Sequence, residues 1–488
     1  MRLIPLLLAT AALAGCTVGP NFERPAAPTA SRYRAPGEHR PAAPAEPQAM
    51  FGAGPQARWW EAFGSPELNA LVEQAMAHNQ SLAASNATLA AAREEVRAIA
   101  GKQLPQIDAN ARIEQEQINL AAFGFSGPNP FGTAGNPEFH LYSVGGGINY
   151  DLDLFGGLRR QVEQTAAQAE AQQRQTEAAH LTVAGQVVNQ VLSIAAIRAQ
   201  IATARALLAD DLRNVDLTQK RKQAGEGTLV EVLNAQSQYT ADRGDLPQLD
   251  QQLDEARHLL ATLVGVSPAD LGPTNFDLTS FRLPADVPVT LPSALVHKRP
   301  DILQAEADLH AATAAIGVAT AKLYPDITLG ATLTQGAPSV SGLVKNAFRG
   351  YDIFAGLTAP IFHGGALRAQ KRAAIDRARA SAATYQQTVL SSFQQVADLL
   401  SALQSDARSV SNQKESVAVA RRSLDLSRRS FQVGNSGILQ VLDSERLYQR
   451  ASYALALART RQYLNVARLY VATAGGWTEP TQVAATTP

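Results

Sequence analysis

The sequence predicts an α+β fold in which very long helices alternate with β-hairpins, and in which one structural unit occurs twice. No proline occurs between Pro360 and Pro480, and proline breaks the interior of a helix. Stretches of about ten residues with alternating apolar side chains lie between the helical runs. Similar segments recur at an offset of 209 residues, as from Gly225 to Gly434.

The proline-free run from Gly364 to Trp477 predicts two long helices joined by a break. Two glycines and small polar residues form the break, Phe431-Gln432-Val433-Gly434-Asn435-Ser436-Gly437, which is typical of a helix that ends and restarts. The first helix, Gly364 to Val433, would be about 70 residues or roughly 105 Å long. A compact globular domain does not need a helix of that length.

The charge balance points to no charged partner. The chain has 488 residues with 43 Lys+Arg and 43 Asp+Glu, so its net charge is zero. Neutrality gives no support for a nucleic-acid or an anionic-membrane partner. Charged residues make up 18%, below the ~25% of soluble domains, which suits helices packed closely together.

The N-terminus predicts a signal peptide over residues 1–15. Met1-Arg2 is a positive start, Leu3 to Leu13 is apolar, and Leu13-Ala14-Gly15-Cys16 is a small-residue cleavage site. The last four residues resemble the bacterial lipobox, in which the cysteine is acylated. Cys16, the only cysteine, is therefore the expected lipid attachment site; the alternative is an inert thiol in an ordinary signal sequence. Thr17 in place of Asp resembles the sorting signal for the outer membrane.

The repeat divides the rest of the chain. Gly225-Glu226-Gly227 parallels Gly434 to Gly437, and Tyr142 parallels Tyr351 at the same offset. The expected segments are a lipidated N-terminal arm with an equatorial segment (16–65), repeat 1 (66–265), an inter-repeat equatorial link (266–299), repeat 2 (300–474) and a C-terminal tail (475–488). Each repeat would hold a helix, a β-hairpin and a long helix pair.

The first helix of each repeat is expected from Pro66 to about Ala100 and from Pro300 to about Leu323. The long helix pair of repeat 1 is expected from Leu158 to about Lys222 and from Thr228 to about Val264, with a kink at Pro247.

Four strands with one apolar face are expected between these helices. Their apolar sets are Ile107, Ala109, Ala111 and Ile113; Tyr142, Val144, Ile148, Tyr150 and Leu152; Ile327, Leu329, Ala331 and Leu333; and Ile353, Ala355, Leu357, Ala359 and Ile361. Such strands are typical of a transmembrane β-barrel, although a soluble sandwich strand has the same period. Four strands are too few to close, so three copies supplying twelve strands are expected.

Several motifs resemble those of the outer-membrane factors, the RND-type efflux outer-membrane lipoproteins (NodT/OprM-like, TolC superfamily). They occur in the family's order: Cys16 to Pro25, Trp59 to Leu68, Tyr150-Asp151-Leu152-Asp153-Leu154-Phe155-Gly156-Gly157, Lys298 to Glu306 and Thr358 to Gly365. The alternative role of Trp59 and Trp60 is simple core packing, which does not conflict with the resemblance.

The resemblance implies a homotrimer in the outer membrane. A twelve-stranded transmembrane β-barrel would continue into a long periplasmic α-helical barrel, around which the N-terminal arm, the C-terminus and the inter-repeat link would form a collar. The function would be passive export of small molecules, fed by an inner-membrane RND-type pump through a periplasmic adaptor. The protein would be lipid-anchored to the outer membrane and extend into the periplasm.

No catalytic or metal-binding pattern occurs in the sequence, so neither an enzyme nor a cofactor is expected. The expected functional positions are the breaks between the long helices, with glycines at Gly225, Gly227, Gly434 and Gly437. Leu439 and Asp443 lie on one face and resemble the leucine and aspartate that narrow the periplasmic aperture of related channels. The alternative for Asp443 is a solvated helix residue.

The matching positions of repeat 1, Glu231 and Asn234, are candidate tethers between neighbouring hairpins, or ordinary helix residues. Related secretion channels have a second aspartate where this chain has Gln440, which argues against a double aspartate ring here.

Two alternative functions remain at this point. An outer-membrane channel for protein secretion would share the fold, although the lipobox favours small-molecule efflux. A soluble periplasmic coiled-coil adaptor would explain the long helices but not the two hairpins.

Overall fold

The structure is a computed structural model that describes residues 17–35, 47–52, 54–119 and 138–474. These residues form two compact units. The first contains the chain up to Arg24, Ala90–Glu170 and Glu306–Ala383, and the second contains Pro25–Leu89, Ala171–Ala305 and the chain from Thr384. The expected signal peptide, Cys16, Trp477, the C-terminal tail and nearly all of the loop after Asn119 lie outside the described residues.

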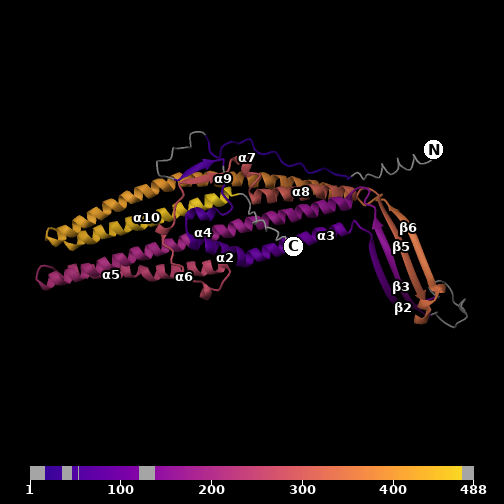
Figure 1. Ribbon diagram of the computed structural model, residues 1–488, viewed down its shortest axis with the longest axis horizontal. Helices are drawn as coiled ribbons and strands as arrows, with labels where there is room; N and C mark the ends of the chain where they lie inside the picture. Colours follow the sequence, from indigo (N-terminus) through magenta and orange to yellow (C-terminus); the bar gives the residue numbers. More distant parts are fainter. Residues whose placement is uncertain (1–16, 36–46, 53, 120–137, 475–488) are drawn as a thin grey trace, which may run out of the picture. The chain divides into compact units, whose positions relative to one another are not determined.

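A four-stranded antiparallel sheet dominates the first unit. Its strands are β2 (Gln106–Gln117), β3 (Glu138–Asp151), β5 (Asp326–Ala337) and β6 (Arg349–Thr358), in the order β2-β3-β5-β6. Figure 1 shows the four strands side by side as long arrows. The expected hairpins β2–β3 and β5–β6 are confirmed, and β3 pairs with β5 to join them. Within the described sheet, β2 and β6 each pair on one side only.

The strand register separates an apolar face from a polar face. Ile107 pairs with Ile148, Ile148 with Ala331 and Ala331 with Ile353, so one apolar row crosses all four strands. One residue further along β2, the row on the other face is polar or small and consists of Asp108, Gly147, Thr332 and Asp352. The apolar row is exposed, with Ile107 77% and Ile353 76% accessible. The predicted alternation is therefore confirmed, and the described residues leave the apolar face uncovered.

The sequence expectations about the ends of two strands are wrong. β3 ends at Asp151, so Leu152 lies beyond that strand. β6 ends at Thr358, so Ala359 and Ile361 lie beyond it. Pro360 explains this because it has no N–H to donate to a neighbouring strand.

The first helix of repeat 1 is two helices, α2 (Pro66–His78) and α3 (Gln80–Gly101). Asn79 between them is extended, and its side-chain oxygen accepts from the backbone N–H of Leu82 (3.2 Å), which caps α3. Its amide also donates to the carbonyl of Leu263 (2.8 Å). The tertiary contact and the cap together interrupt the helix, although the helical spacing of apolar residues is continuous in the sequence.

The long helices are confirmed. α4 (Gly157–Gln223) and α9 (Ala366–Gln432) each run for 67 residues without interruption. The returning helix of α9 is α10 (Ile438–Thr473), and the returning helix of α4 is divided into α5 (Leu229–Arg243) and α6 (Asp245–Val264). The division falls at Gly244, three residues before Pro247, where the sequence predicts a kink. α8 (Pro300–Ala321) is the first helix of repeat 2.

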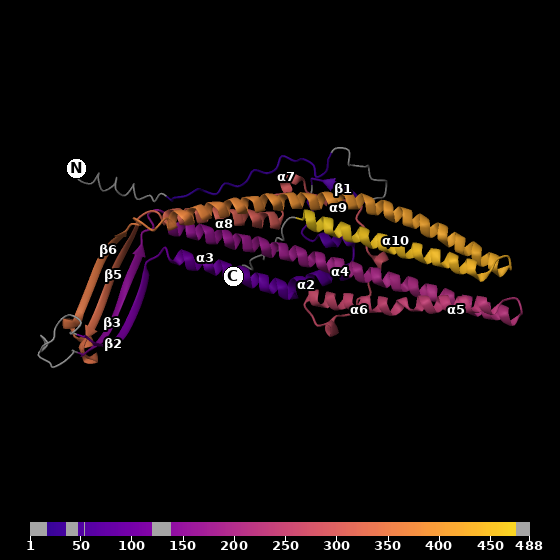
Figure 2. The ribbon, with the colours of Figure 1, turned by 180° about the vertical axis from the view of Figure 1, so that it is seen from behind.

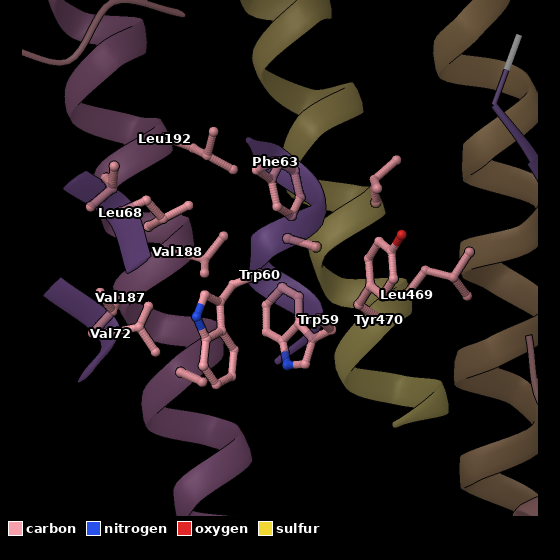
Figure 3. Packing of buried hydrophobic residues seen from close by; sticks show 14 of the residues in the cluster. Trp59, Trp60, Phe63, Leu68, Val72, Val187, Val188, Leu192, Leu469 and Tyr470 are labelled. Carbon is pink, nitrogen blue, oxygen red and sulfur yellow. The ribbon is translucent and has the colours of Figure 1, made fainter. Parts of the chain in front are cut away.

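The main hydrophobic core lies in the second unit around a short 3-10 helix, η1 (Trp59–Phe63). Trp59, Trp60 and Phe63 are buried, and the ring of Tyr470 from α10 stacks on Trp59 at 5.7 Å between centroids. Figure 3 shows these rings between α4 and α10, with Leu192 of α4 close by. Core packing is thus the role of the two tryptophans.

The N-terminal arm, the inter-repeat link and the C-terminal end of α10 meet beside this core. β1 (Gln48–Phe51) pairs in parallel with β4 (Asp286–Val289) of the link. The Tyr33 hydroxyl donates to the Thr290 carbonyl (2.6 Å), and the Thr290 hydroxyl donates to the carbonyl of Thr473 (3.0 Å). A four-residue helix, α7 (Pro292–Leu295), follows in the link.

Among the described helices, α4 alone contains an 18-residue stretch apolar enough to cross a bilayer. Of that stretch 44% is buried, and Val183, Val187 and Val191 of α4 lie in the core around η1. This stretch is therefore explained by packing.

We predict that Phe63→Ala lowers the free energy of unfolding by about 3–5 kcal/mol, because a fully buried ring is replaced by a cavity. Thermal unfolding followed by circular dichroism in detergent measures it. The control is Phe51→Ala, whose ring is 51% exposed. Equal losses for the two variants would contradict the assignment of the core.

Candidate functional site

The two long hairpins turn with the same backbone geometry. Gly225 after α4 has φ +79° and Gly434 after α9 has φ +78°. The N–H of Glu226 donates to the carbonyl of Arg221, and the N–H of Asn435 donates to the carbonyl of Ser430, both at 2.9 Å. This pattern satisfies the last carbonyls of a helix through a residue in the left-handed region, where glycine is strongly favoured. The predicted stops are confirmed.

The helices restart in different ways after the two turns. The Thr228 hydroxyl accepts from the N–H of Glu231 (3.2 Å) at the start of α5, while the Glu231 carboxylate accepts from the N–H of Thr228 (2.8 Å). Gly227 lies against this cap, since a Cβ there would be 3.2 Å from the Glu231 carboxylate. Gly437 precedes α10 without a side-chain cap. Glu231 therefore stabilises its own helix start.

The first turns of α5 and α10 enclose a shallow hollow of about 390 Å³. Its lining residues are Val230, Glu231, Asn234, Gly437, Ile438, Leu439 and Gln440. Leu439 is 63% exposed, whereas its neighbour Ile438 is buried. The structure thus brings Leu439 together with Glu231 and Asn234, while Asp443 lies one turn further along α10, exposed and outside the hollow.

The opposite face of α10 packs against α9. Ile438, Val441 and Leu442 form a small core with Leu424 and Phe431. Side chains of α10 that point away from this core, including Leu439 and Asp443, are presented outward. Their exposure is therefore a consequence of the helix face on which they lie.

A buried polar cluster joins the helices behind the turns. Arg428 of α9 pairs with Asp210 of α4 and with Glu445 of α10. The Asn214 amide donates to the second oxygen of the Glu445 carboxylate (2.6 Å), and Glu445 is buried. Arg446 of α10 donates to Gln238 of α5 (2.7 Å). Polar contacts therefore connect α4, α5, α9 and α10.

Asp211 is the most unusual member of this cluster. It is 1% exposed, and no hydrogen-bond donor lies in reach of either carboxylate oxygen. Burial, followed by the nearby carboxylates of Asp242 and Glu445, raises the pKa of Asp211 to about 8, against a smaller opposing effect of Arg428. A protonated Asp211 can donate to Asp242, which removes the repulsion between the buried Asp211 carboxylate and the half-buried Asp242 carboxylate.

Arg221 ties the two turns together. Its guanidinium lies 4.5 Å from the centroid of the Phe431 ring and donates to the Phe431 carbonyl (3.2 Å). Sequence reasoning missed Arg221, Asp211, Arg428 and Glu445. For Glu445 a signal existed, because its spacing from Ile438, Val441 and Leu442 places a carboxylate on the apolar face of α10. The contacts of Arg221, Asp211 and Arg428 depend on which helix packs beside them, so no local pattern predicts their roles.

We predict a pH dependence that originates in Asp211. Its pKa is about 8 in the folded protein and near 3.8 in the unfolded chain, so the folded state binds more protons between these values. Stability from this group is complete below pH 4 and is lost as the pH rises toward 8. Asp211→Asn should make the fall in melting temperature between pH 5 and pH 9 smaller than in the wild type.

The control for this measurement is Asp216→Asn, an exposed carboxylate on the same helix that pairs with Lys220. It should leave the pH dependence of the melting temperature unchanged. An unchanged pH dependence in Asp211→Asn would refute the assignment.

The sequence was compared with protein-family models and with known proteins. The family model described as outer membrane efflux protein matches residues 71–266 and 291–475. The pyoverdine export outer membrane protein OpmQ of Pseudomonas aeruginosa is 32% identical over 421 residues, covering 86% of this chain and 87% of the relative. The cation efflux system protein CusC of Escherichia coli is 27% identical over 480 residues, covering 98% and 99%.

Solved structures of outer-membrane channels have the same fold as this chain. The outer-membrane channel OprN matches with a TM-score of 0.83 and 28% identity over 95% of this chain and 100% of that chain. The open state of the MtrE outer membrane channel of Neisseria gonorrhoeae matches with a TM-score of 0.75 and 25% identity over 95% and 99%. With its long helical hairpins, its four-stranded sheet and a family match over most of its length, this chain belongs to the outer membrane efflux protein family.

Proposed function

We propose that this protein is the outer-membrane channel of a tripartite efflux system. In this proposal a homotrimer exports small molecules passively, after an inner-membrane pump delivers them through a periplasmic adaptor. The observation that carries the proposal is the sheet β2-β3-β5-β6, which has an exposed apolar face, a polar face and two open edges. OpmQ and CusC, whose names describe export and efflux, support the same role.

Closure of the sheet supports a trimer. Three successive antiparallel pairings make the edge strands β2 and β6 run in opposite directions, so β6 of one copy can pair antiparallel with β2 of the next. Two copies would give eight strands, whose interior is filled by side chains, so three copies give the smallest barrel with a lumen. The polar row with Asp108, Thr332 and Asp352 would then line the lumen and the apolar row would face lipid.

The exposed apolar face disfavours a soluble adaptor. Ile107 and Ile353 of one row, and Ile113 of a second row on the same face, are each more than three-quarters exposed. Exposure of such side chains to water is unfavourable, whereas exposure to lipid is not. The efflux role is favoured over protein secretion because the curated relatives named above are efflux and export proteins.

The turns of the helical hairpins are the proposed periplasmic aperture. Leu439 and Asp443 lie on the exposed face of α10, next to the turn at Gly434. In a trimer each would form a ring of three, the leucines closing the passage by packing and dewetting and the aspartates favouring cations. Glu231 and Asn234 are proposed as tethers toward the neighbouring hairpin, in addition to the local cap that Glu231 makes.

The lipid anchor is proposed at Cys16, and the outer membrane is the expected location. One lipid cluster adds a tether to the barrel and does not replace a membrane span.

The lipid-facing side of the sheet can be tested by a charge. Ile353→Arg should cost about 2–4 kcal/mol if this side chain lies near the bilayer midplane, and it should reduce the folded fraction in liposomes. Thr334→Arg, on the opposite face of the neighbouring strand, should fold normally. Band shift on unheated gels measures folding, and native mass spectrometry of the folded wild type should give three copies. Equal folding of both variants, or a monomeric mass, would contradict the barrel.

The aperture can be tested by conductance. Leu439→Ala combined with Asp443→Ala should raise the single-channel conductance of the trimer in planar bilayers severalfold, because the narrowest rings are removed. The control is Leu426→Ala, which truncates an exposed leucine on the neighbouring helix α9 and should leave conductance unchanged. Unchanged conductance in the double variant would contradict the aperture assignment.

A further inference from the structure

The first described residues of the chain are bound to the first unit by specific contacts. The N–H of Val18 donates to the carbonyl of Phe155 (3.1 Å), in the short connection between β3 and α4. Thr17 lies against Gly156, where a Cβ would come 2.6 Å from the threonine methyl group. Two motifs that are more than a hundred residues apart in sequence therefore pack together.

Arg160, in the first turn of α4, makes most of the remaining contacts with this segment. Its guanidinium donates to the carbonyls of Val18 (3.2 Å) and Gly19 (3.4 Å) and to the side-chain oxygen of Asn21 (2.7 Å). A fourth bond goes to Glu163 (2.7 Å), and Arg160 is 3% exposed. With the bond to Glu163 the guanidinium makes four hydrogen bonds, one more than the three donors of a lysine ammonium can make, and its planar fork directs them.

Glycines make room for this arrangement. Gly19 has φ +93°, and a Cβ on it would lie 2.5 Å from the Cα of Gly317 in α8. A Cβ on Gly317 would lie 2.7 Å from Cγ of Arg160. The segment and the arginine stem therefore both rest on the bare backbone of α8, and any side chain at position 317 would displace them.

Two further contacts hold the segment beyond Asn21. The Phe22 ring stacks on His310 of α8 at 4.4 Å, and His310 in turn bonds Glu163 (3.1 Å). Arg24 pairs with Glu306, whose side chain is buried (2.6 Å). The whole segment from Thr17 to Arg24 is thus seated before the chain continues into the second unit.

The binding place of the segment Thr17–Arg24 lies at one end of the four-stranded sheet. It lies where β3 ends, at Asp151, and the same end of the sheet carries Asp326 at the start of β5 and Thr358 at the end of β6. The paired rows of the sheet end here, and the exposed apolar side chains of Ile361 and Phe362 follow just beyond β6. In the proposed barrel this is the boundary between hydrocarbon and water.

We propose that Arg160 is the positioning residue of the N-terminal lipid anchor. By holding Val18 to Asn21 at the junction of β3 and α4, it fixes the point at which Cys16, one peptide bond before Thr17, leaves the protein. The acyl chains then enter the bilayer beside the barrel, with no free linker between anchor and channel. This inference rests on the proposed lipid attachment and adds the residue that sets its place and depth.

The single cysteine makes a direct test practical. The full chain, secreted with an ordinary signal peptide, keeps an unacylated thiol at Cys16, which can carry a spin label in the folded protein in lipid nanodiscs. In the wild type the label should be immobile and at headgroup depth, judged by collision with oxygen against a water-soluble nickel chelate. In Arg160→Ala and Arg160→Lys more than half of the signal should become mobile and shift toward water.

A second variant guards against misfolding. Gly317→Leu keeps Arg160 but should displace it, and it should mobilise the label in the same way. The matched control is Arg377→Ala, an exposed arginine of α9, which should change neither mobility nor depth. Native mass spectrometry confirms that each variant has the same assembly as the wild type. A label that is mobile in the wild type, or immobile in both Arg160→Ala and Gly317→Leu, would overturn the proposal.

Mass spectrometry of the protein made with its native signal peptide separates the two proposals. Acyl groups on Cys16 together with a label that Arg160 immobilises support both. Absence of acyl groups would overturn the lipid attachment and with it the anchor role, whereas acyl groups with a label insensitive to Arg160 would overturn only the positioning role.

Discussion

The constraint on which the architecture depends is that a sheet inside a bilayer must have no open edge. Every unpaired N–H or carbonyl costs several kcal/mol where water is absent. One chain supplies four antiparallel strands and leaves the outer sides of β2 and β6 unpaired within the described sheet. In the proposed barrel, the four described strands therefore do not close by themselves, and pairing of β2 and β6 with strands of further copies would satisfy their free backbone groups.

The ends of the helical hairpins near their turns are held together by only a small hydrophobic core. The core behind the turn of α9 and α10 contains few residues, including Leu424, Phe431 and Ile438, whereas the core around Trp59 and Trp60 collects residues from many elements. Near the turns the two hairpins meet through polar contacts, in which Arg428 pairs with Asp210 and the Asn214 amide donates to Glu445. Arg221 lies against Phe431, and Leu217 of α4 packs on the small core. Apolar contacts between the hairpins are concentrated in the larger core around Trp59 and Trp60.

The sequence predicted much of this fold because its signals are local. Glycines at Gly225 and Gly434 end helices by their own backbone freedom, and alternation fixes which face of each strand is apolar. The interruption at Asn79 could not be predicted, because it depends on a hydrogen bond to Leu263. At the candidate site Leu439 was found by its place in a motif, whereas Asp211 was missed because its burial is decided by side chains from three other helices.

The polar cluster around Arg160 in the first unit and the polar cluster behind the turns in the second unit differ in how their polar groups are satisfied. At the junction of β3 and α4 all the contacts of Arg160 are complementary, with one cation facing carbonyls, an amide oxygen and one carboxylate. Behind the turns, Asp210 and Glu445 pair with Arg428, and Asp210 also pairs with Arg213. A balanced cluster favours one geometry. Asp211 is the exception in this cluster, because burial and the nearby carboxylates of Asp242 and Glu445 raise its pKa, so the charge behind the turns depends on pH.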